Sequence, residues 1–233
     1  MDSHTQTRCP NPECAFVFPV PEVDADKRNH FKGFCPECNI EATFRTLEAL
    51  ESIEVAYNKK LEKGALAGGP TWPEGKIPAQ SVLVEDVRSL WNVGSIFRTA
   101  DGSGFEKIYL SGITGTPPRK EIEKVSLGSE NSVSWHYKIN PLQVINDLKK
   151  SDVQVIGLEV SPTSKLLSSA LNQDLIKRPF CLVVGNEVSG LSPQVISSCS
   201  IVCHLPMRGM KESLNVAVAF GVAAYALSDH FAK

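Results

Sequence analysis

The sequence lacks any long uncharged apolar run, although 42% of its 233 residues are hydrophobic. A membrane-spanning helix needs about twenty consecutive apolar residues, so we expect no membrane span. It also lacks a secretory signal, because it opens with the polar and partly acidic segment Met1–His4. We therefore expect a cytoplasmic protein with one sizeable core and a small appended module.

Neither sign of charge dominates, since 24 Lys and Arg residues face 26 Asp and Glu residues, for a net charge of −2. A field this weak does not attract a polyanion to the whole chain, so any binding of nucleic acid must rest on local basic patches. DNA is not an expected partner. The candidate patches, each of which is also compatible with a solvated surface, are Arg119 with Lys120 and Lys124, and Arg208 with Lys211.

Two common phosphate-binding sequences are absent. No glycine loop ends in the Lys-Ser/Thr of a Walker motif, and no G-x-G-x-x-G fingerprint follows a predicted strand. These absences argue against nucleoside triphosphate chemistry and against a dinucleotide-dependent dehydrogenase.

Four cysteines near the N-terminus form two short pairs, Cys9 with Cys14 and Cys35 with Cys38. Each pair lies among prolines or glycines, so the backbone can turn and aim both sulfurs inward. Two such pairs with a spacer of roughly twenty residues predict a tetrahedral zinc site, with reduced thiols or a disulfide as the alternatives. Four cysteines close the coordination shell, which favours a role in folding or docking.

The chain divides into three predicted segments. Residues 1–45 form a zinc-ribbon-like module, and residues 46–77 form a connector helix, Thr46–Lys63, followed by a Gly/Pro-rich linker. In residues 78–233 strands and helices alternate, which predicts an α/β domain with a largely parallel sheet. The predicted strands are Ser81–Glu85, Lys107–Leu110, Val153–Glu159, Phe180–Gly185 and Ser200–Leu205. The predicted helices are Val93–Gly104, Pro141–Ser151, a short segment from Pro193, and Ser213–Asp229.

The last predicted helix, Ser213–Asp229, is apolar nearly all the way round. Such a helix must be covered on more than one side. It therefore lies either deep in the core or at a subunit interface.

Three segments rich in glycine and polar residues follow strand candidates: Asn92–Gly104, Gly185–Ser192 and Leu205–Asn215. In an open parallel sheet, ligands bind beyond the carboxyl ends of the strands. We therefore expect all three segments to face one crevice.

At these segments the chain resembles the SpoU (TrmH-like) branch of the SPOUT methyltransferases. Their motifs N-x-G-x-x-x-R-x-A, G-N-E-x-x-G-L-S, and P-M-x-G with S-L-N soon after all match in order, within about residues 78–230. The resemblance implies an α/β sheet whose C-terminal part threads a deep trefoil knot, an exception to the rule that chains do not thread. It also implies a homodimer that uses S-adenosylmethionine (AdoMet) to methylate the 2′-hydroxyl of an RNA ribose.

The resemblance further implies roles for individual residues. Because a guanidinium stays protonated, we expect Arg98 to hold an RNA phosphate and stabilise the developing alkoxide rather than to act as a base. Alternatives are a surface ion pair for Arg98, helix capping for Asn92 and Ser213, and core packing for Ile201 and Leu214. The implied catalytic residues are Asn92, Arg98, Glu187, Ser213 and Asn215, of which the asparagines and Ser213 would fix Arg98 and the loops while Glu187 orients the arginine. The implied cofactor residues are Gly185, Glu187, Ile201, Leu205, Pro206 and Leu214.

Two functions of different class follow. The first is an RNA ribose 2′-O-methyltransferase acting on tRNA or rRNA. The second is a non-catalytic RNA- or protein-binding module that keeps the knotted fold. A domain retired from catalysis would be expected to lose Arg98 or the Ser213-Leu214-Asn215 triplet, so their presence favours the enzyme.

Overall fold

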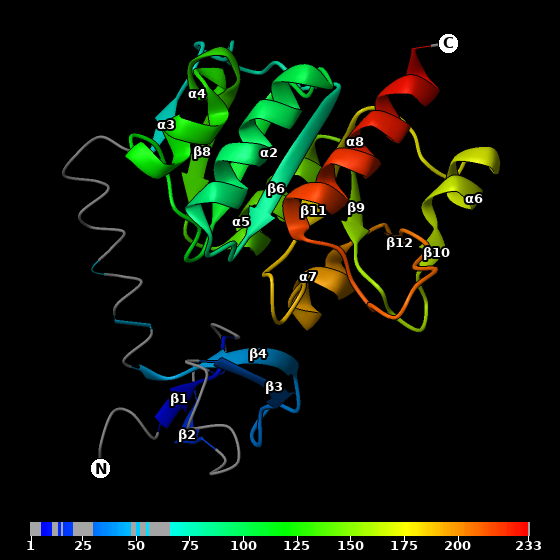
Figure 1. The fold of residues 1–233 in the computed structure, drawn as a ribbon. Helices are drawn as coiled ribbons and strands as arrows, with labels where there is room; N and C mark the ends of the chain where they lie inside the picture. The colour runs from blue at the N-terminus through cyan, green and yellow to red at the C-terminus, as the bar shows by residue number, and fades with distance from the viewer. Residues whose placement is uncertain are drawn as a thin grey trace. The chain divides into compact units, whose positions relative to one another are not determined.

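The computed structural model describes residues 6–10, 14, 16–20, 30–47, 50–51, 55 and 66–232 (Figure 1). The chain divides into two compact units, residues 1–63 with 192–197, and residues 64–191 with 198–233. The connector helix predicted over Thr46–Lys63 lies mostly outside the described residues. Among the described helices, none combines the length and apolar character needed to cross a membrane.

The N-terminal unit is built from two small antiparallel strand pairs. Its core packs the ring of Phe18 edge-on against that of Phe44, with centroids 5.1 Å apart, beside the buried Cys9 and Cys35. A core this small gives limited stability by itself, so a unit of this size usually needs a disulfide bond or a structural metal ion. The paired strands are β1 (Gln6–Arg8) with β2 (Val17–Pro19), and β3 (His30–Phe34) with β4 (Glu41–Arg45).

The larger unit contains an eight-stranded sheet with the order β10-β12-β9-β11-β6-β7-β8-β5. Every neighbouring pair is parallel except β5 with β8, which confirms the predicted largely parallel α/β sheet. The strands are β5 (Ala67–Gly68), β6 (Gln80–Glu85), β7 (Lys107–Ser111), β8 (Ser134–Lys138), β9 (Gln154–Leu158), β10 (Lys165–Leu166), β11 (Phe180–Val184) and β12 (Ile201–His204).

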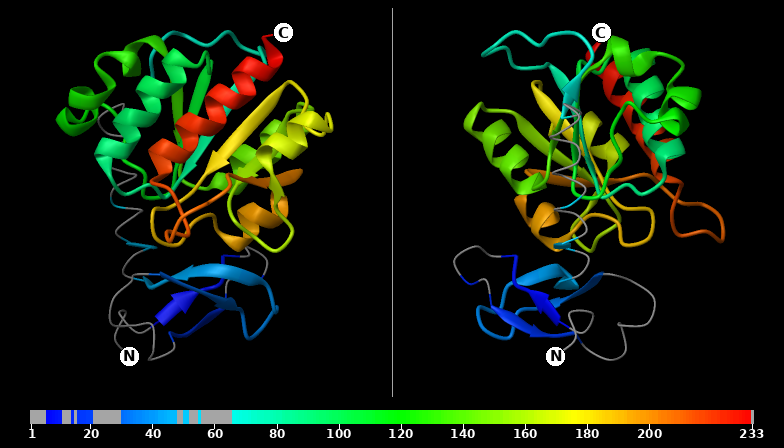
Figure 2. Two further views of the ribbon diagram at one scale, coloured as in Figure 1. Left: turned by 45° about the vertical axis from the view of Figure 1, so that its right-hand side comes forward. Right: turned by 90° about the vertical axis from the view of Figure 1, so that its left-hand side faces the viewer.

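The sheet is covered on both faces, with α2 and α8 side by side on one face and α5 on the other (Figures 1 and 2). Strands β6 and β11 are buried along their whole length, as expected for central parallel strands. The ring of Phe105 lies edge-on to the rings of Phe180 and Phe220 and joins the sheet to α8. The helices are α2 (Leu90–Gly102), α3 (Lys120–Ser126), α4 (Ser129–Ser132), α5 (Pro141–Lys150), α6 (Leu167–Asn172), α7 (Pro193–Ser198) and α8 (Val216–Phe231).

Two helices begin at positions other than those predicted. The Ser89 side chain accepts a hydrogen bond from the Asn92 amide, so α2 begins at Leu90. Asn215 accepts from the Ala217 amide at 2.9 Å, so α8 begins only after Asn215. The capping alternative for Asn92 and Ser213 is therefore wrong, because the caps are Ser89 and Asn215.

Candidate functional site

A pocket of about 220 Å³ lies at the carboxyl ends of β9, β11 and β12. This is the edge of a parallel sheet where ligands are expected. Its walls come from the end of β9 and the loop that follows it, the loop after β11, and the loop between β12 and α8. The lining residues are 158–160, 184–190, 204–205, 207, 212–214, 216 and 219.

The loop after β11 is tightly folded. The Asn186 side chain donates to the Asp86 carbonyl at 2.7 Å and accepts from the Ser189 amide at 3.0 Å. A Cβ on Gly185 would lie only 2.5 Å from the carbonyl carbon of Gly190, so the close turn requires glycine there. The loop thus presents a fixed main chain to the pocket.

Three of the predicted polar residues form a hydrogen-bonded chain. The Asn215 side chain donates to Asn92 Oδ1 at 3.1 Å, and Asn92 Nδ2 donates to Glu187 Oε1 at 2.9 Å. Glu187 also accepts from the backbone amides of Arg88 and Ser89, each at 3.0 Å. These hydrogen bonds join the starts of α2 and α8 to the loop after β11.

Glu187 carries its charge at the start of α2. Burial acts to raise its pKa, but hydrogen bonds from the Arg88 and Ser89 amides and from Asn92 outweigh burial and hold the pKa of Glu187 below its ordinary value of 4.5. The carboxylate also faces the N-terminal end of a helix, where a negative charge is favoured. Glu187 is therefore ionised at neutral pH and positions the Asn92 amide.

The depressed pKa predicts a specific acid sensitivity. The stabilisation from Glu187 is present above about pH 4.5, the unfolded-state value, and is lost as pH falls through the lower folded-state pKa. We expect the difference in melting temperature between wild type and Glu187→Gln to shrink only below that pH. Glu123→Gln, on the exposed surface of α3, is the control for replacing a carboxylate by an amide. A Glu187→Gln difference that stays constant down to pH 3 would contradict this assignment.

Ser213 and Arg98 stand outside the hydrogen-bonded chain. Ser213 lines the pocket and its hydroxyl has no hydrogen-bond partner in the part of the chain that the structure describes. Arg98 lies on the exposed surface of α2, does not line the pocket, and likewise makes no hydrogen bond or ion pair with a described residue. Six helical residues turn the chain by about 240°, so Arg98 and Asn92 leave α2 on different faces. Within one chain, Asn92 and Glu187 do not hold the arginine.

Four of the six predicted cofactor residues, Gly185, Glu187, Leu205 and Leu214, line the pocket. Ile201 is not among the lining residues because it begins β12, whereas the pocket lies at the other end of that strand. Pro206 is exposed beside the pocket and is not part of its lining either.

Two lining residues were missed from the sequence. Glu159 accepts hydrogen bonds from the Val160 amide at 3.0 Å and the Leu191 amide at 2.9 Å, and so holds two loops together. His204 Nδ1 lies 2.9 Å from the Ser164 hydroxyl. Both residues stand at the carboxyl end of a predicted strand, and this position was the signal that could have identified them.

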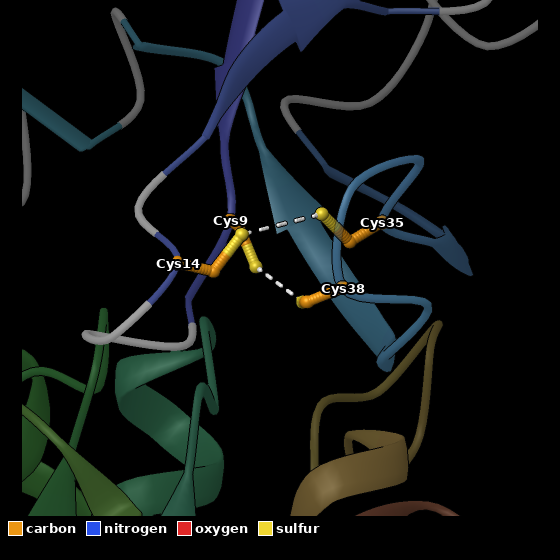
Figure 3. Close-up of side chains that lie close together, drawn as sticks. All are labelled: Cys9, Cys14, Cys35 and Cys38. Atoms are coloured by element: carbon orange, nitrogen blue, oxygen red, sulfur yellow. Dashed lines mark hydrogen bonds between the residues drawn. The ribbon is translucent and has the colours of Figure 1, made fainter.

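The four N-terminal cysteines form a second cluster (Figure 3). Their sulfurs all lie within 4.8 Å of one another, with Cys9 to Cys38 at 3.6 Å and Cys14 to Cys35 at 3.8 Å. A disulfide would need about 2.05 Å, whereas zinc–sulfur bonds of about 2.3 Å place tetrahedral sulfurs about 3.8 Å apart. The donor set and spacing therefore fit zinc.

The turn at Cys38 favours a thiolate. The Asn39 backbone has a φ of 56°, and its amide donates to the Cys35 carbonyl at 2.9 Å. A hydrogen bond from the Ile40 backbone is the largest influence on Cys38 and, with those from the other three cysteines, outweighs burial and lowers the pKa of Cys38 to about 7. Zinc binds the thiolate form of cysteine.

Comparison with known proteins agrees with this geometry. Residues 79–225 match the SpoU rRNA Methylase family. A tRNA (guanosine(18)-2′-O)-methyltransferase of Aquifex aeolicus is 31% identical over 62% of this chain and 66% of its own, and a 23S rRNA (guanosine-2′-O-)-methyltransferase of Bordetella pertussis is 26% identical over 64% of this chain and 58% of its own. The chain thus spans about three fifths of the length of these relatives.

Solved structures show the same fold. An AdoMet-bound rRNA methyltransferase from Sinorhizobium meliloti superposes with a TM-score of 0.61, at 27% identity over 66% of this chain and 57% of its own. The A. aeolicus TrmH/SpoU tRNA modifying enzyme superposes with a TM-score of 0.58, at 28% identity over 75% of this chain and 84% of its own. With the matched family domain covering more than half of the sequence, the chain belongs to the SpoU rRNA methylase family.

Proposed function

We propose that this protein transfers a methyl group from AdoMet to the 2′-hydroxyl of a ribose in tRNA or rRNA. The observation that carries the proposal is the chain Asn215–Asn92–Glu187 beside a pocket at the carboxyl edge of the sheet. The activities for which the two relatives are named, one on tRNA and one on 23S rRNA, support the reaction type. An RNA substrate of either kind is consistent with a cytoplasmic protein.

AdoMet supplies an electrophilic methyl group when it is bound in the pocket. The rigid main chain at Gly185 and the apolar side chains of Leu205 and Leu214 offer hydrogen bonds and apolar contact to such a ligand. We include in this proposal that the loops after β11 and β12 thread as the family's knot. Their fixed shape would position the sulfonium before the RNA arrives.

The Ser213 hydroxyl and the Asn92–Asn215 pair would orient the ribose and the loop around it. A ribose hydroxyl has a high pKa, so the alkoxide that develops during transfer needs a nearby positive charge. Arg98 is the residue that we propose for that charge, but within one chain it does not reach the pocket wall. A second copy must then bring it there.

A homodimer through α8 provides such a copy. Val218, Val222 and Tyr225 form an apolar stripe on α8 and are 52%, 50% and 50% exposed. A Cβ on Gly102 of α2 would lie 3.0 Å from the Tyr225 hydroxyl, so the stripe continues onto α2, on the helix face that carries Arg98 one turn earlier. We propose that two copies pack on this stripe and that each Arg98 serves its partner's pocket.

We expect sedimentation to give a dimer at micromolar concentration. Val222→Glu would place a charge in the middle of the apolar stripe, so this variant should be monomeric and should lose methyl transfer. Leu127→Glu, at an exposed apolar position after α3, is the matched control and should remain dimeric and active. A Val222→Glu monomer that keeps full activity would refute the shared site.

The N-terminal cysteine cluster is proposed to hold one structural zinc ion through Cys9, Cys14, Cys35 and Cys38. All four donors come from the protein, so the ion would have no open position for substrate. The unit would serve to dock RNA or a protein partner.

The substrate can be identified by mapping the 2′-O-methylated nucleotides that disappear from the total RNA of a deletion strain. Purified protein should then methylate that RNA in a single turnover, and calorimetry should show AdoMet binding. Protein that binds AdoMet but modifies no RNA, in the cell or in the tube, would instead be the non-catalytic binding module.

A further inference from the structure

A second pocket, of about 250 Å³, is lined by residues of α5, β7 and β8 and of the linker before β6. Helix α5 covers the sheet face opposite α2 and α8 (Figure 2). We call this pocket the α5 pocket. Its sheet wall comes from β7 and β8, where Tyr109 stands opposite His136 in the parallel register. Three lysines also line it, namely Lys76 from the linker, Lys107 at the start of β7 and Lys138 at the end of β8. One carboxylate, Asp147 of α5, faces them, and it lies 4.0 Å from Lys150.

Two of the three lysines, Lys76 and Lys107, lie over aromatic rings. Lys107 Nζ lies 5.3 Å from the centroid of Trp72 and 5.5 Å from that of Tyr109, while Lys76 Nζ lies 4.8 Å from the Trp72 centroid. Trp72 is fixed in turn by a 2.7 Å hydrogen bond from its indole nitrogen to the Lys76 carbonyl. In the part of the chain that the structure describes, none of the three lysines has an ion-pair partner. Their positive charge is therefore available to a ligand.

The strand beneath the pocket also carries unused polar atoms. His136 lines the pocket, and its Nδ1 is buried without a hydrogen-bond partner among the described residues. The Ser134 hydroxyl, two residues earlier on the same face of β8, is likewise buried without a described partner but is not part of the pocket lining. Buried polar atoms are nearly always paired in native proteins, so the unpaired His136 Nδ1 in the pocket wall indicates a site that a ligand completes.

The charges in the pocket wall favour the binding of an anion. Burial lowers the pKa of Lys107, and burial followed by the charges of Lys107 and Lys138 lowers the pKa of His136. Burial, ahead of Cys181 and Asp147, raises the pKa of Tyr109, so its hydroxyl remains a donor. An anion in the α5 pocket would relieve the repulsion among these cations.

We propose that the α5 pocket binds a phosphodiester of RNA, as a contact separate from the pocket at the carboxyl ends of β9, β11 and β12. The choice of RNA rests on the proposed function, whereas the anion site itself rests on Lys76, Lys107, Lys138 and the unpaired Nδ1 of His136. An acidic whole-chain balance gives RNA little general attraction. Built local sites of this kind must then supply the phosphate contacts.

The test uses the full-length protein and a single-stranded oligouridylate of about ten nucleotides, a length in the range of single-strand binding sites. The logarithm of the RNA association constant falls linearly with the logarithm of salt concentration, and loss of one phosphate contact makes this slope shallower by about 0.7. The same loss lowers the affinity about fourfold near 0.15 M salt. We expect that loss for Lys107→Gln and for the exposed Lys138→Gln, which carries little risk to folding. Lys177→Gln, on the exposed loop before β11, is the matched control and should bind as wild type does.

AdoMet calorimetry on the same variants separates this inference from the proposed function. AdoMet affinity should be unchanged by either substitution, because the two pockets share no lining residue. If both lysine variants bind AdoMet normally and keep the wild-type salt dependence of oligouridylate affinity, the proposed phosphate site in the α5 pocket is wrong. The proposed methyltransferase function would not be affected. If inorganic phosphate fails to displace the bound oligouridylate at concentrations below tens of millimolar, this result supports RNA as the ligand. If inorganic phosphate binds tightly and oligouridylate does not compete with it, this result would overturn the RNA assignment.

Discussion

Arg98→Ala is expected to lose most methyl transfer while binding AdoMet as wild type does. Arg98 does not line the pocket, so the cofactor should not sense its removal. Its proposed work is to stabilise the alkoxide in the transition state, and losing one preorganised charged contact of this kind costs about 10²–10³ in rate. Lysine should rescue poorly, because it lacks the planar fork that binds phosphate. The measurements are single-turnover transfer to the mapped RNA and calorimetric AdoMet binding.

A surface arginine supplies the matched control. Arg119 pairs with Glu121 at 3.6 Å on the exposed surface, and Arg119→Ala should transfer at the wild-type rate when RNA is saturating. A normal rate for Arg98→Ala would refute the proposed role of Arg98 and leave the family assignment intact.

Mixed dimers can decide whether Arg98 acts within its own chain or across the interface. One parent carries Arg98→Ala and the other carries Glu187→Ala, so each is inactive alone. If Arg98 serves its partner's pocket, random mixing restores about a quarter of wild-type activity, because half of the dimers hold one intact site. If Arg98 serves its own pocket, each site of a mixed dimer keeps one defect and activity stays at the parental level.

The sequence predicts the buried strands of the larger unit well. The apolar residues of β6 and β11 form short continuous runs, and such runs follow directly from burial on both faces of a parallel sheet. The predicted ends of these strands agree with the structure to within one residue. The predicted helix starts are less accurate, because each start is set by the residue that caps it, Ser89 for α2 and Asn215 for α8. Hydrophobic periodicity does not indicate which of several polar residues is the cap.

Strand β8 was missed for a different reason. Ser134, His136 and Lys138 give one of its faces a polar pattern, which hides a strand that is mostly buried. Two residues of this face, His136 and Lys138, line the α5 pocket. Sequence patterns are expected to fail where residues serve a ligand rather than the core.

The placement of Arg98 could not be predicted from the motif. The N-x-G-x-x-x-R-x-A pattern puts Asn92 and Arg98 on one helix, and the resemblance implies that they act together. Helical geometry instead separates them by about 240°, so the two side chains leave α2 on different faces, and our proposal brings them together across two chains. The exposed α8 stripe provides the surface on which the two chains would meet.

Cys35→Ser is expected to release zinc and unfold the N-terminal unit while the larger unit remains folded. Cys35 is buried in a small core with Phe18 and Phe44, so little else can hold that unit together once a ligand is lost. Structural zinc sites supply about 10–16 kcal/mol of apparent binding energy at neutral pH, and in so small a unit this energy is folding energy. The larger unit has its own eight-stranded sheet and should keep its melting transition.

Metal analysis of the purified protein should give one zinc ion per chain, and less than that in Cys35→Ser. Cys199→Ser, which lies outside the cysteine cluster, is the matched control and should keep full zinc. Chelation of wild type should reproduce the Cys35→Ser result, with amide exchange rising in strands β1 to β4 but not in β6 or β11. Wild-type protein without stoichiometric zinc, or a Cys35→Ser variant that keeps it, would show that the four sulfurs gather for a reason other than zinc.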